Sequence, residues 1–132
     1  MDKHTLQQYR SIRREIAHLE EEKQRVLDRL LSPAAPDGMP HARGNQDSIG
    51  QAIARRDRYQ RLIDNKLDEL IALREEIERA IEGLPSQDRE LIRLRYIEGL
   101  RWEEIAVKLH YSIQHIYHRH GHILLKMRVN KS

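Results

Sequence analysis

Histidine and basic side chains gather near the end of the chain, at spacings that place them on one side of a helix. From Ile105 to Ser132 the sequence has five Lys or Arg, five His and no Asp or Glu. At about 100° per residue, several of these side chains and Gln114 turn towards the same side of the helix expected here. A positive and acid-free surface predicts an anionic partner at this end of the chain. The residues on that side are Gln114, His115, His118, Arg119, His122 and Lys126.

The same residues offer the chemistry that reads bases in duplex DNA. In the major groove, Arg pairs with O6 and N7 of guanine, and Gln pairs with N6 and N7 of adenine. The earlier residues of such a helix reach base edges, and the later ones lie towards phosphates. We therefore expect His122 and Lys126 to contact the DNA backbone. The predicted base-contacting residues are Gln114, His115, His118 and Arg119.

The opposite side of this helix is mostly apolar and is predicted to pack inward. His120 falls on that side, and we expect it to be a buried, hydrogen-bonded structural histidine. The inward residues are Ile113, Ile116, Tyr117, His120, Ile123, Leu124 and Met127.

A metal or catalytic role is not predicted. His115, His118 and His122 have a spacing that can hold zinc, but no acid or cysteine stands beside them to complete the ligand set. Protonated histidines would instead strengthen the attraction for phosphates near pH 6. Glu103 and Glu104 are neighbours, so on a helix they point about 100° apart and form no acid–base pair. We expect a protein that is not an enzyme and needs no cofactor or metal.

Three short helices are predicted to position the basic face. Ser86 is expected to cap a helix over residues 87–98 that ends at Gly99. A helix over 102–109, a turn over 110–112 and a third helix over 113–127 follow, and Ser112 is placed to cap the third. Two short helices across a three-residue turn form a helix-turn-helix.

The front of the chain predicts a long antiparallel helical hairpin, similar to a coiled coil. Apolar residues recur every three or four positions over residues 2–31, and again from Asp47 or Ser48 to about Glu82. A loop rich in Pro and Gly separates them at 32–45. Each stripe needs a partner helix, so the two are expected to pair, and two hairpins are expected to form a homodimer. Polar residues interrupt the stripes at Lys23, Arg56, Gln60 and Arg74.

Composition agrees with an all-α chain of narrow cores. The 132 residues include no Phe and no Cys, and 34% are charged. No apolar run is long enough for a membrane span, so we expect no membrane partner, and the absence of cysteine agrees with a cytoplasmic location. The expected organisation is a hairpin scaffold at 1–83, a DNA-binding domain at 84–128 and a tail at 129–132.

The last third resembles region 4 of bacterial σ70-type factors, which reads the −35 promoter element. The resemblance lies in LP…RELIRLRYIEGL.WEEIAVKL…S…IYHRHGHILLKM, from Leu84 to about Arg128. With the hairpin in front, the chain also resembles small phage regulators of the ArpU/RinA type. The resemblance implies base recognition by the four residues named above, an RNA polymerase contact as an open possibility, and backbone contacts from Arg101, Lys108, His122 and Lys126.

Two departures and two alternatives accompany this resemblance. Arg101 stands where the family usually has a capping Ser or Thr, and His110 stands where it usually has Gly in the turn. We expect a sequence-specific transcriptional regulator of phage or prophage type, which does not initiate transcription alone. A DNA-recognition adaptor, such as a phage small terminase subunit, and an RNA polymerase-binding module are the alternatives.

Overall fold

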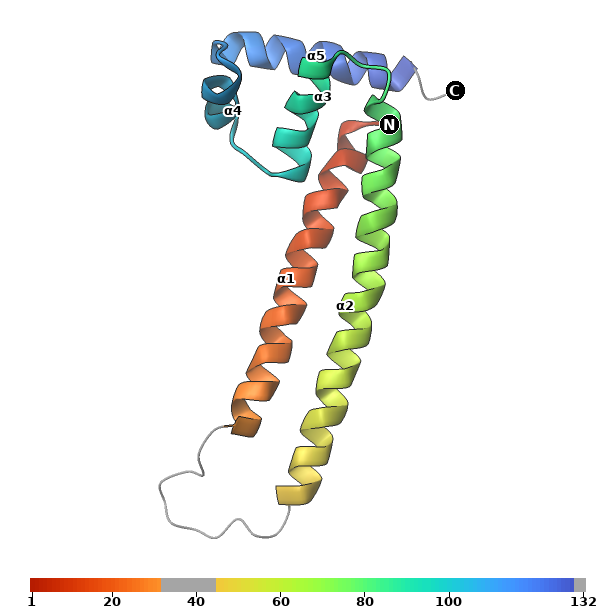
Figure 1. The fold of residues 1–132 in the computed structure, drawn as a ribbon, viewed down its shortest axis with the longest axis vertical. Helices are drawn as coiled ribbons and strands as arrows, with labels where there is room; N and C mark the ends of the chain where they lie inside the picture. The colour runs from red at the N-terminus through yellow and green to blue at the C-terminus, as the bar shows by residue number, and fades with distance from the viewer. Residues whose placement is uncertain (32–44, 130–132) are drawn as a thin grey trace. The chain divides into compact units, whose positions relative to one another are not determined.

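All regular structure in the described part of the chain is helical, as the sequence predicts (Figure 1). The structure, a computed structural model, describes residues 1–31 and 45–129, without the side chains of 45–47 and 129. No strand occurs within these ranges. The predicted loop lies outside them, except for Asn45, which begins a helix two residues before the predicted start. The elements are α1 (Lys3–Leu31), α2 (Asn45–Ile81), α3 (Ser86–Ile92), the π-helix η1 (Arg93–Ile97), α4 (Trp102–Leu109) and α5 (Ile113–Val129).

The chain divides into two compact units. The first unit consists of Met1–Arg13 and Glu69–Ser132, and the second unit is Arg14–Asp68. Both long helices therefore contribute residues to both units. This division by packing differs from the division at residue 83 expected from the sequence. The roles expected for 1–83 and 84–128 stay predictions.

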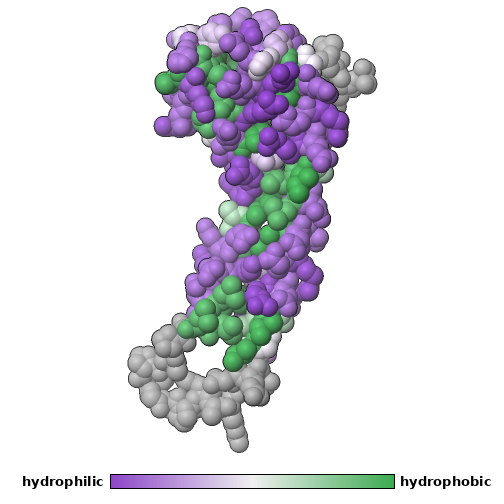
Figure 2. Space-filling view, in the orientation of Figure 1, coloured by the Kyte–Doolittle hydropathy of each residue, from purple (hydrophilic) through white to green (hydrophobic). Residues whose placement is uncertain are grey.

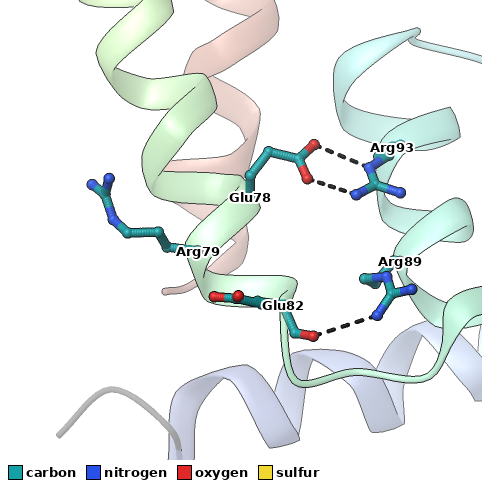
Figure 3. A pocket seen from close by; sticks show the side chains of 5 residues that line it. All are labelled: Glu78, Arg79, Glu82, Arg89 and Arg93. Atoms are coloured by element: carbon teal, nitrogen blue, oxygen red, sulfur yellow. Dashed lines mark hydrogen bonds and ion pairs between the residues drawn. The ribbon is translucent and has the colours of Figure 1, made fainter.

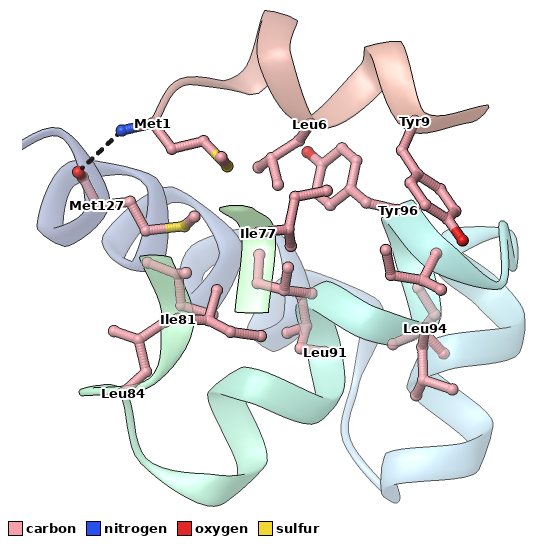
Figure 4. Packing of buried hydrophobic residues seen from close by; sticks show 14 of the residues in the cluster. Met1, Leu6, Tyr9, Ile77, Ile81, Leu84, Leu91, Leu94, Tyr96 and Met127 are labelled. Carbon is pink, nitrogen blue, oxygen red and sulfur yellow. Dashed lines mark hydrogen bonds between the residues drawn. The ribbon is translucent and has the colours of Figure 1, made fainter. Parts of the chain in front are cut away.

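A continuous apolar core holds the first unit together (Figure 4). The start of α1, the end of α2 and every later helix contribute side chains to it, and the most deeply buried are at most 2% exposed. Removing such side chains from water is the main favourable contribution to folding. The amino group of Met1 donates a hydrogen bond to the carbonyl of Met127 at 3.3 Å. The deepest residues are Leu6, Ile77, Ile81, Leu91, Ile92, Ile105, Ile116, Ile123 and Met127.

Where one α-helix was expected over 87–98, the structure has a short α-helix followed by a π-helix. Ser86 is the first helical residue and Pro85 is the N-cap, without a side-chain cap, so the predicted cap at Ser86 is wrong. Proline suits the start of a helix because it lacks the N–H that would stay unpaired there. From Arg93 the chain continues as a π-helix, in which the N–H of Glu98 bonds to the Arg93 carbonyl at 2.9 Å.

Arginines of α1 bind the carbonyl groups that end this π-helix. Arg10 donates from Nη1 to the Gly99 carbonyl at 3.0 Å, and Arg13 donates from Nη1 to the Ile97 carbonyl at 2.9 Å. Gly99 has φ of +76°, a backbone conformation that glycine adopts most easily, and it ends the helix as predicted. These contacts satisfy carbonyls that a helix end leaves unpaired.

In the second unit, segments of α1 and α2 pair in antiparallel order. Lys23 Nζ donates to Gln60 Oε1 at 2.6 Å, and Glu15 forms an ion pair with Lys66 at 3.0 Å. As residue numbers rise in α1 they fall in α2, which is the predicted hairpin arrangement. Two of the polar interruptions thus bond to each other.

Much of the apolar stripe of α2 is not buried (Figure 2). Within the part of α2 that belongs to the second unit, Ile63 is fully buried, but four other large apolar residues are at least 38% exposed. The prediction that the hairpin would hide its own stripe is therefore wrong for these positions, because one partner helix covers only a narrow part of the surface. The exposed residues are Ile49, Ile53, Leu62 and Leu67.

Candidate nucleic-acid interface

The α4–turn–α5 segment has the geometry that the sequence predicts. α4 ends at Leu109, and His110 follows in the left-handed region with φ of 62° and ψ of 40°. The N–H of Tyr111 bonds to the Ala106 carbonyl at 3.0 Å, which closes the helix end. Ser112 Oγ then accepts a hydrogen bond from the N–H of His115 at 3.1 Å. The predicted cap at Ser112 is confirmed, and His110 adopts the conformation for which glycine is usual.

Arg101 begins α4 without a side chain that can cap it, as expected. Glu104 partly compensates, because its Oε1 accepts from the Arg101 backbone N–H at 3.2 Å and from Arg101 Nε at 2.9 Å. This is one half of a capping box. The side-chain hydrogen bond from Arg101 lowers the pKa of the Glu104 carboxyl below its ordinary value. Arg101 is exposed and its side chain binds Glu104, and its expected contact with the DNA backbone stays a prediction.

The inner face of α5 packs as predicted with one exception. Ile116, Ile123 and Met127 are buried in the core. Tyr117 was expected inside but is 48% exposed, and its ring meets the edge of Trp102 with 5.6 Å between centroids. Tyr117 follows Ile116 by about 100°, which brings it to the border of the inner face.

His120 is the buried, hydrogen-bonded histidine that the sequence predicts. It is 8% exposed, and its Nε2 lies 2.6 Å from the hydroxyl of Tyr96. Burial, aided by the positive charges of Lys3 and Arg95, lowers the pKa of His120 to about 4. Burial also raises the pKa of Tyr96 to about 12. Both side chains are therefore neutral near pH 7, and the contact between them is part of the buried core.

The outer face of α5 carries the polar residues expected to meet DNA. Five of the predicted base or backbone contacts on α5 are exposed: Gln114, His115, His118, His122 and Lys126. The Nε2 atoms of His118 and His122 lie 3.2 Å apart, a contact in which one nitrogen donates and the other accepts. Within the described residues, no group of three or more His, Cys, Asp or Glu is arranged to hold a metal ion.

Arg119, expected to read a base, lies at the border of this face and binds within the protein. Its Nη2 is 2.8 Å from Oδ1 of Asp88, whose side chain is 3% exposed, whereas the Arg119 side chain is 40% exposed. The contact is an ion pair and not a well-aligned hydrogen bond. Sequence reasoning missed Asp88, since nothing local links a residue of α3 to one of α5. If Arg119 also contacts DNA, it must do so while it forms the ion pair with Asp88.

Other exposed residues of α4 and α5 accompany the predicted contacts. Lys108, a predicted backbone contact, is exposed, and its neighbour Val107 is 76% exposed. On α5, Leu125 is 60% exposed and Gly121 is exposed. Neither was predicted as part of the face, although their positions one turn apart could have indicated it.

A second group of charged residues lines a shallow pocket between the end of α2 and α3 (Figure 3). Arg93 binds Glu78 with both Nε and Nη2, at 3.0 and 2.6 Å, and Arg89 donates to the carbonyls of Glu82 and Leu84 at 3.4 and 3.0 Å. The hydrogen bond from Arg93 is the main reason why the pKa of Glu78 is lowered. Since Arg89 and Arg93 already have acceptors, this group stabilises the junction of α2 and α3.

The capped turn between α4 and α5, with its exposed polar helix, defines the class of the protein as a helix-turn-helix protein. Residues 74–127 match the family model described as Sigma-70, region 4. This part of the chain is therefore a sigma-70 region 4-like helix-turn-helix, a DNA-binding domain. The match covers fewer than half of the 132 residues and begins within α2, ahead of the predicted start at Leu84.

Further comparisons add no relative. Neither the curated proteins nor the solved structures gave a match. Among the described helices, none combines the length and the apolar character that crossing a bilayer requires.

Proposed function

We propose that the chain is a sequence-specific regulator of transcription that reads the DNA major groove with α5. The observation that carries this proposal is the exposed face of α5 directly after the capped turn, within a region 4-like domain. Gln114, His115 and His118 stand in its first two turns, where a recognition helix reaches base edges. Arg119 joins this set if it keeps its hold on Asp88 while it contacts a base.

Backbone contacts would come from both helices of the motif. Arg101 at the N-cap of α4, Lys108 on α4, and His122 and Lys126 on α5 are all exposed. The described part of α5 contains no Asp or Glu, so no carboxylate on that helix repels a phosphate. Neutralising phosphates releases counterions, and we expect binding to weaken steeply as salt rises.

We further propose that the protein acts as a homodimer through its hairpin. The exposed Ile49, Ile53, Leu62 and Leu67 of the second unit form an apolar stripe that a second copy would cover. A two-fold dimer presents two recognition helices, so its DNA site would be an inverted repeat. A hairpin in front of a region 4-like end supports placing the protein among phage or prophage regulators of the ArpU/RinA type, acting in the cytoplasm of a bacterial host.

Selection of bound sequences from a random pool of duplex DNA tests this function. The mass of the protein–DNA complex is measured in parallel. Enrichment of an inverted repeat bound by a dimer is the expected result. A ring of many copies on one site would instead favour a packaging adaptor such as a small terminase subunit. No enrichment, with DNA binding absent at low salt, would contradict the proposal and favour an RNA polymerase-binding module.

A further inference from the structure

Gly121 stands in the middle of α5, and nothing within the protein requires a glycine there. It is exposed, and a Cβ atom built on it would have no neighbour within 4 Å. Its backbone does not adopt positive φ, since among the described glycines only Gly99 does. Neither packing nor backbone conformation thus explains the residue, in contrast to Gly99, where a Cβ would run into the side chain of Arg10.

A glycine inside a helix lowers stability relative to alanine, because it gives up more conformational freedom on folding. An alanine at 121 would be accommodated without any shift of its neighbours. The fold of the free protein alone would therefore favour alanine. A reason for glycine must come from something that approaches this point of the helix from outside.

The position of Gly121 on α5 indicates what approaches it. At about 100° per residue, Gly121 lies within about 60° of Gln114, His118 and Leu125, towards the edge of the outer face that is nearest Tyr117. This is the face proposed to enter the major groove. Leu125 is 60% exposed and Tyr117, on the other side of Gly121 along the helix, is 48% exposed; a leucine there can meet a thymine methyl group or a deoxyribose.

We propose that Gly121 is the point of closest approach between α5 and DNA. The missing side chain lets the helix backbone settle deeply enough for Gln114 and His118 to reach base edges and for Leu125 to touch apolar parts of the groove. This inference rests on the proposed function and adds a contact that determines how deeply the helix docks. Tyr117 and Leu125 stand one turn before and one turn after Gly121, but the polar face beside them and the absence of acids among the described residues of α5 favour DNA over a protein partner.

The test compares Gly121→Ala and Gly121→Leu with Gly50→Ala as the matched control. Gly50 is also exposed, also inside a helix, and also has open space at its Cβ position, but it lies on α2. Each variant is measured as the full chain, by thermal unfolding and by binding to a synthetic duplex that carries the selected sequence. The two alanine substitutions should raise the melting temperature by about 3 °C. Gly121→Leu should raise it or leave it unchanged.

The expected result is a separation of stability from binding. Gly121→Ala should weaken DNA binding by about tenfold, and Gly121→Leu should weaken it more, because an added side chain holds the helix away from the groove. Gly50→Ala should bind like the wild type. Wild-type affinity for Gly121→Ala would overturn the inference but leave the proposed function intact. Wild-type protein that binds no duplex would overturn the proposed function and this inference with it.

Two other outcomes would also overturn the inference. A lower melting temperature for Gly121→Ala would show that the glycine serves the fold. Weaker self-association with unchanged DNA binding would show that a second copy of the chain, and not DNA, approaches at this point.

Discussion

The two units have a similar spacing of apolar residues in sequence but differ in how completely those residues are buried. In the first unit, apolar residues from all helices meet in one core, and Arg10 and Arg13 bind the carbonyls where the π-helix ends. In the second unit, Ile63 is buried while Ile49, Ile53, Leu62 and Leu67 stay exposed. Several helices that approach from different directions cover a wide apolar face, whereas one partner helix covers a narrow stripe. The second unit therefore has an apolar surface that a further chain could cover.

Matched substitutions of isoleucine give the largest effect and test this contrast. Ile105 is fully buried, so Ile105→Ala should lower the free energy of unfolding by about 2–5 kcal/mol, through lost burial and the cavity left behind. Ile53 is 39% exposed, so Ile53→Ala should change it by less than about 0.5 kcal/mol in dilute protein. Urea unfolding measures both.

Protein concentration then separates the monomer from the proposed dimer. If a second copy covers Ile53, the stability of wild type should rise with concentration and Ile53→Ala should reduce that rise. Equal losses for Ile105→Ala and Ile53→Ala at low concentration would contradict the contrast between the units.

The next effect compares a histidine in each unit. Because the pKa of His120 is about 4 in the folded protein and about 6.5 in the unfolded chain, the folded state favours neutral His120. Its contribution is complete above pH 6.5 and is lost as the pH falls towards 4, by about 3 kcal/mol in total. Lys3 of α1 and Arg95 of η1 are the charges that add to this shift.

The measurement is the free energy of unfolding between pH 7 and pH 4.5. His120→Gln should be less stable at pH 7 and should lose less stability on acidification than the wild type. His18→Gln is the control, since the His18 side chain is 68% exposed in the second unit. An equal acid response in wild type and His120→Gln would show that burial of His120 does not set the pH dependence.

Glycine substitutions should differ in sign between the units. Gly99→Ala requires alanine at φ of +76° and displaces Arg10 from the Gly99 carbonyl, so we expect a loss of about 1–3 kcal/mol. Gly50→Ala replaces a glycine within α2 where space is open, and should gain about 0.5–1 kcal/mol. Thermal unfolding of the two variants measures both signs. A stable Gly99→Ala protein would mean that Arg10 and the backbone rearrange at little cost.

Local sequence signals predicted the elements that depend on local physics. The apolar spacing of α4, the turn at His110 and the cap at Ser112 all follow from neighbours in the chain, and the structure has them where expected. The π-helix was missed because its end is held by Arg10 and Arg13, which are more than eighty residues away. A contact of that range leaves no periodic signal in the sequence.

The candidate site shows the same limit. Helical angles correctly predicted that Gln114 and His118 are exposed and that His120 is buried. Such angles assign each residue to an inner or an outer face and do not describe residues at the border between them. Arg119 sits at the border, and its partner Asp88 lies on another helix, so the ion pair between them was not predictable. The ion pair also means that Arg119→Ala would leave a buried carboxylate unpaired, and would disturb stability as well as any base contact.

The last comparison concerns DNA affinity, and it uses single polar or basic side chains from the two units. Lys126→Ala should weaken binding to every duplex by a similar factor and reduce the salt dependence by about one phosphate contact, because Lys126 is proposed to meet the backbone. Gln114→Ala should instead relax the preference at one base pair, at a cost of about 1–3 kcal/mol against the preferred sequence. Arg58→Ala removes an exposed cation of the second unit and should leave both properties unchanged. Binding to the selected and an unrelated duplex at several salt concentrations distinguishes these patterns. If Arg58→Ala and Lys126→Ala weakened binding equally, DNA would contact both units, and the assignment of the interface to α4 and α5 alone would be wrong.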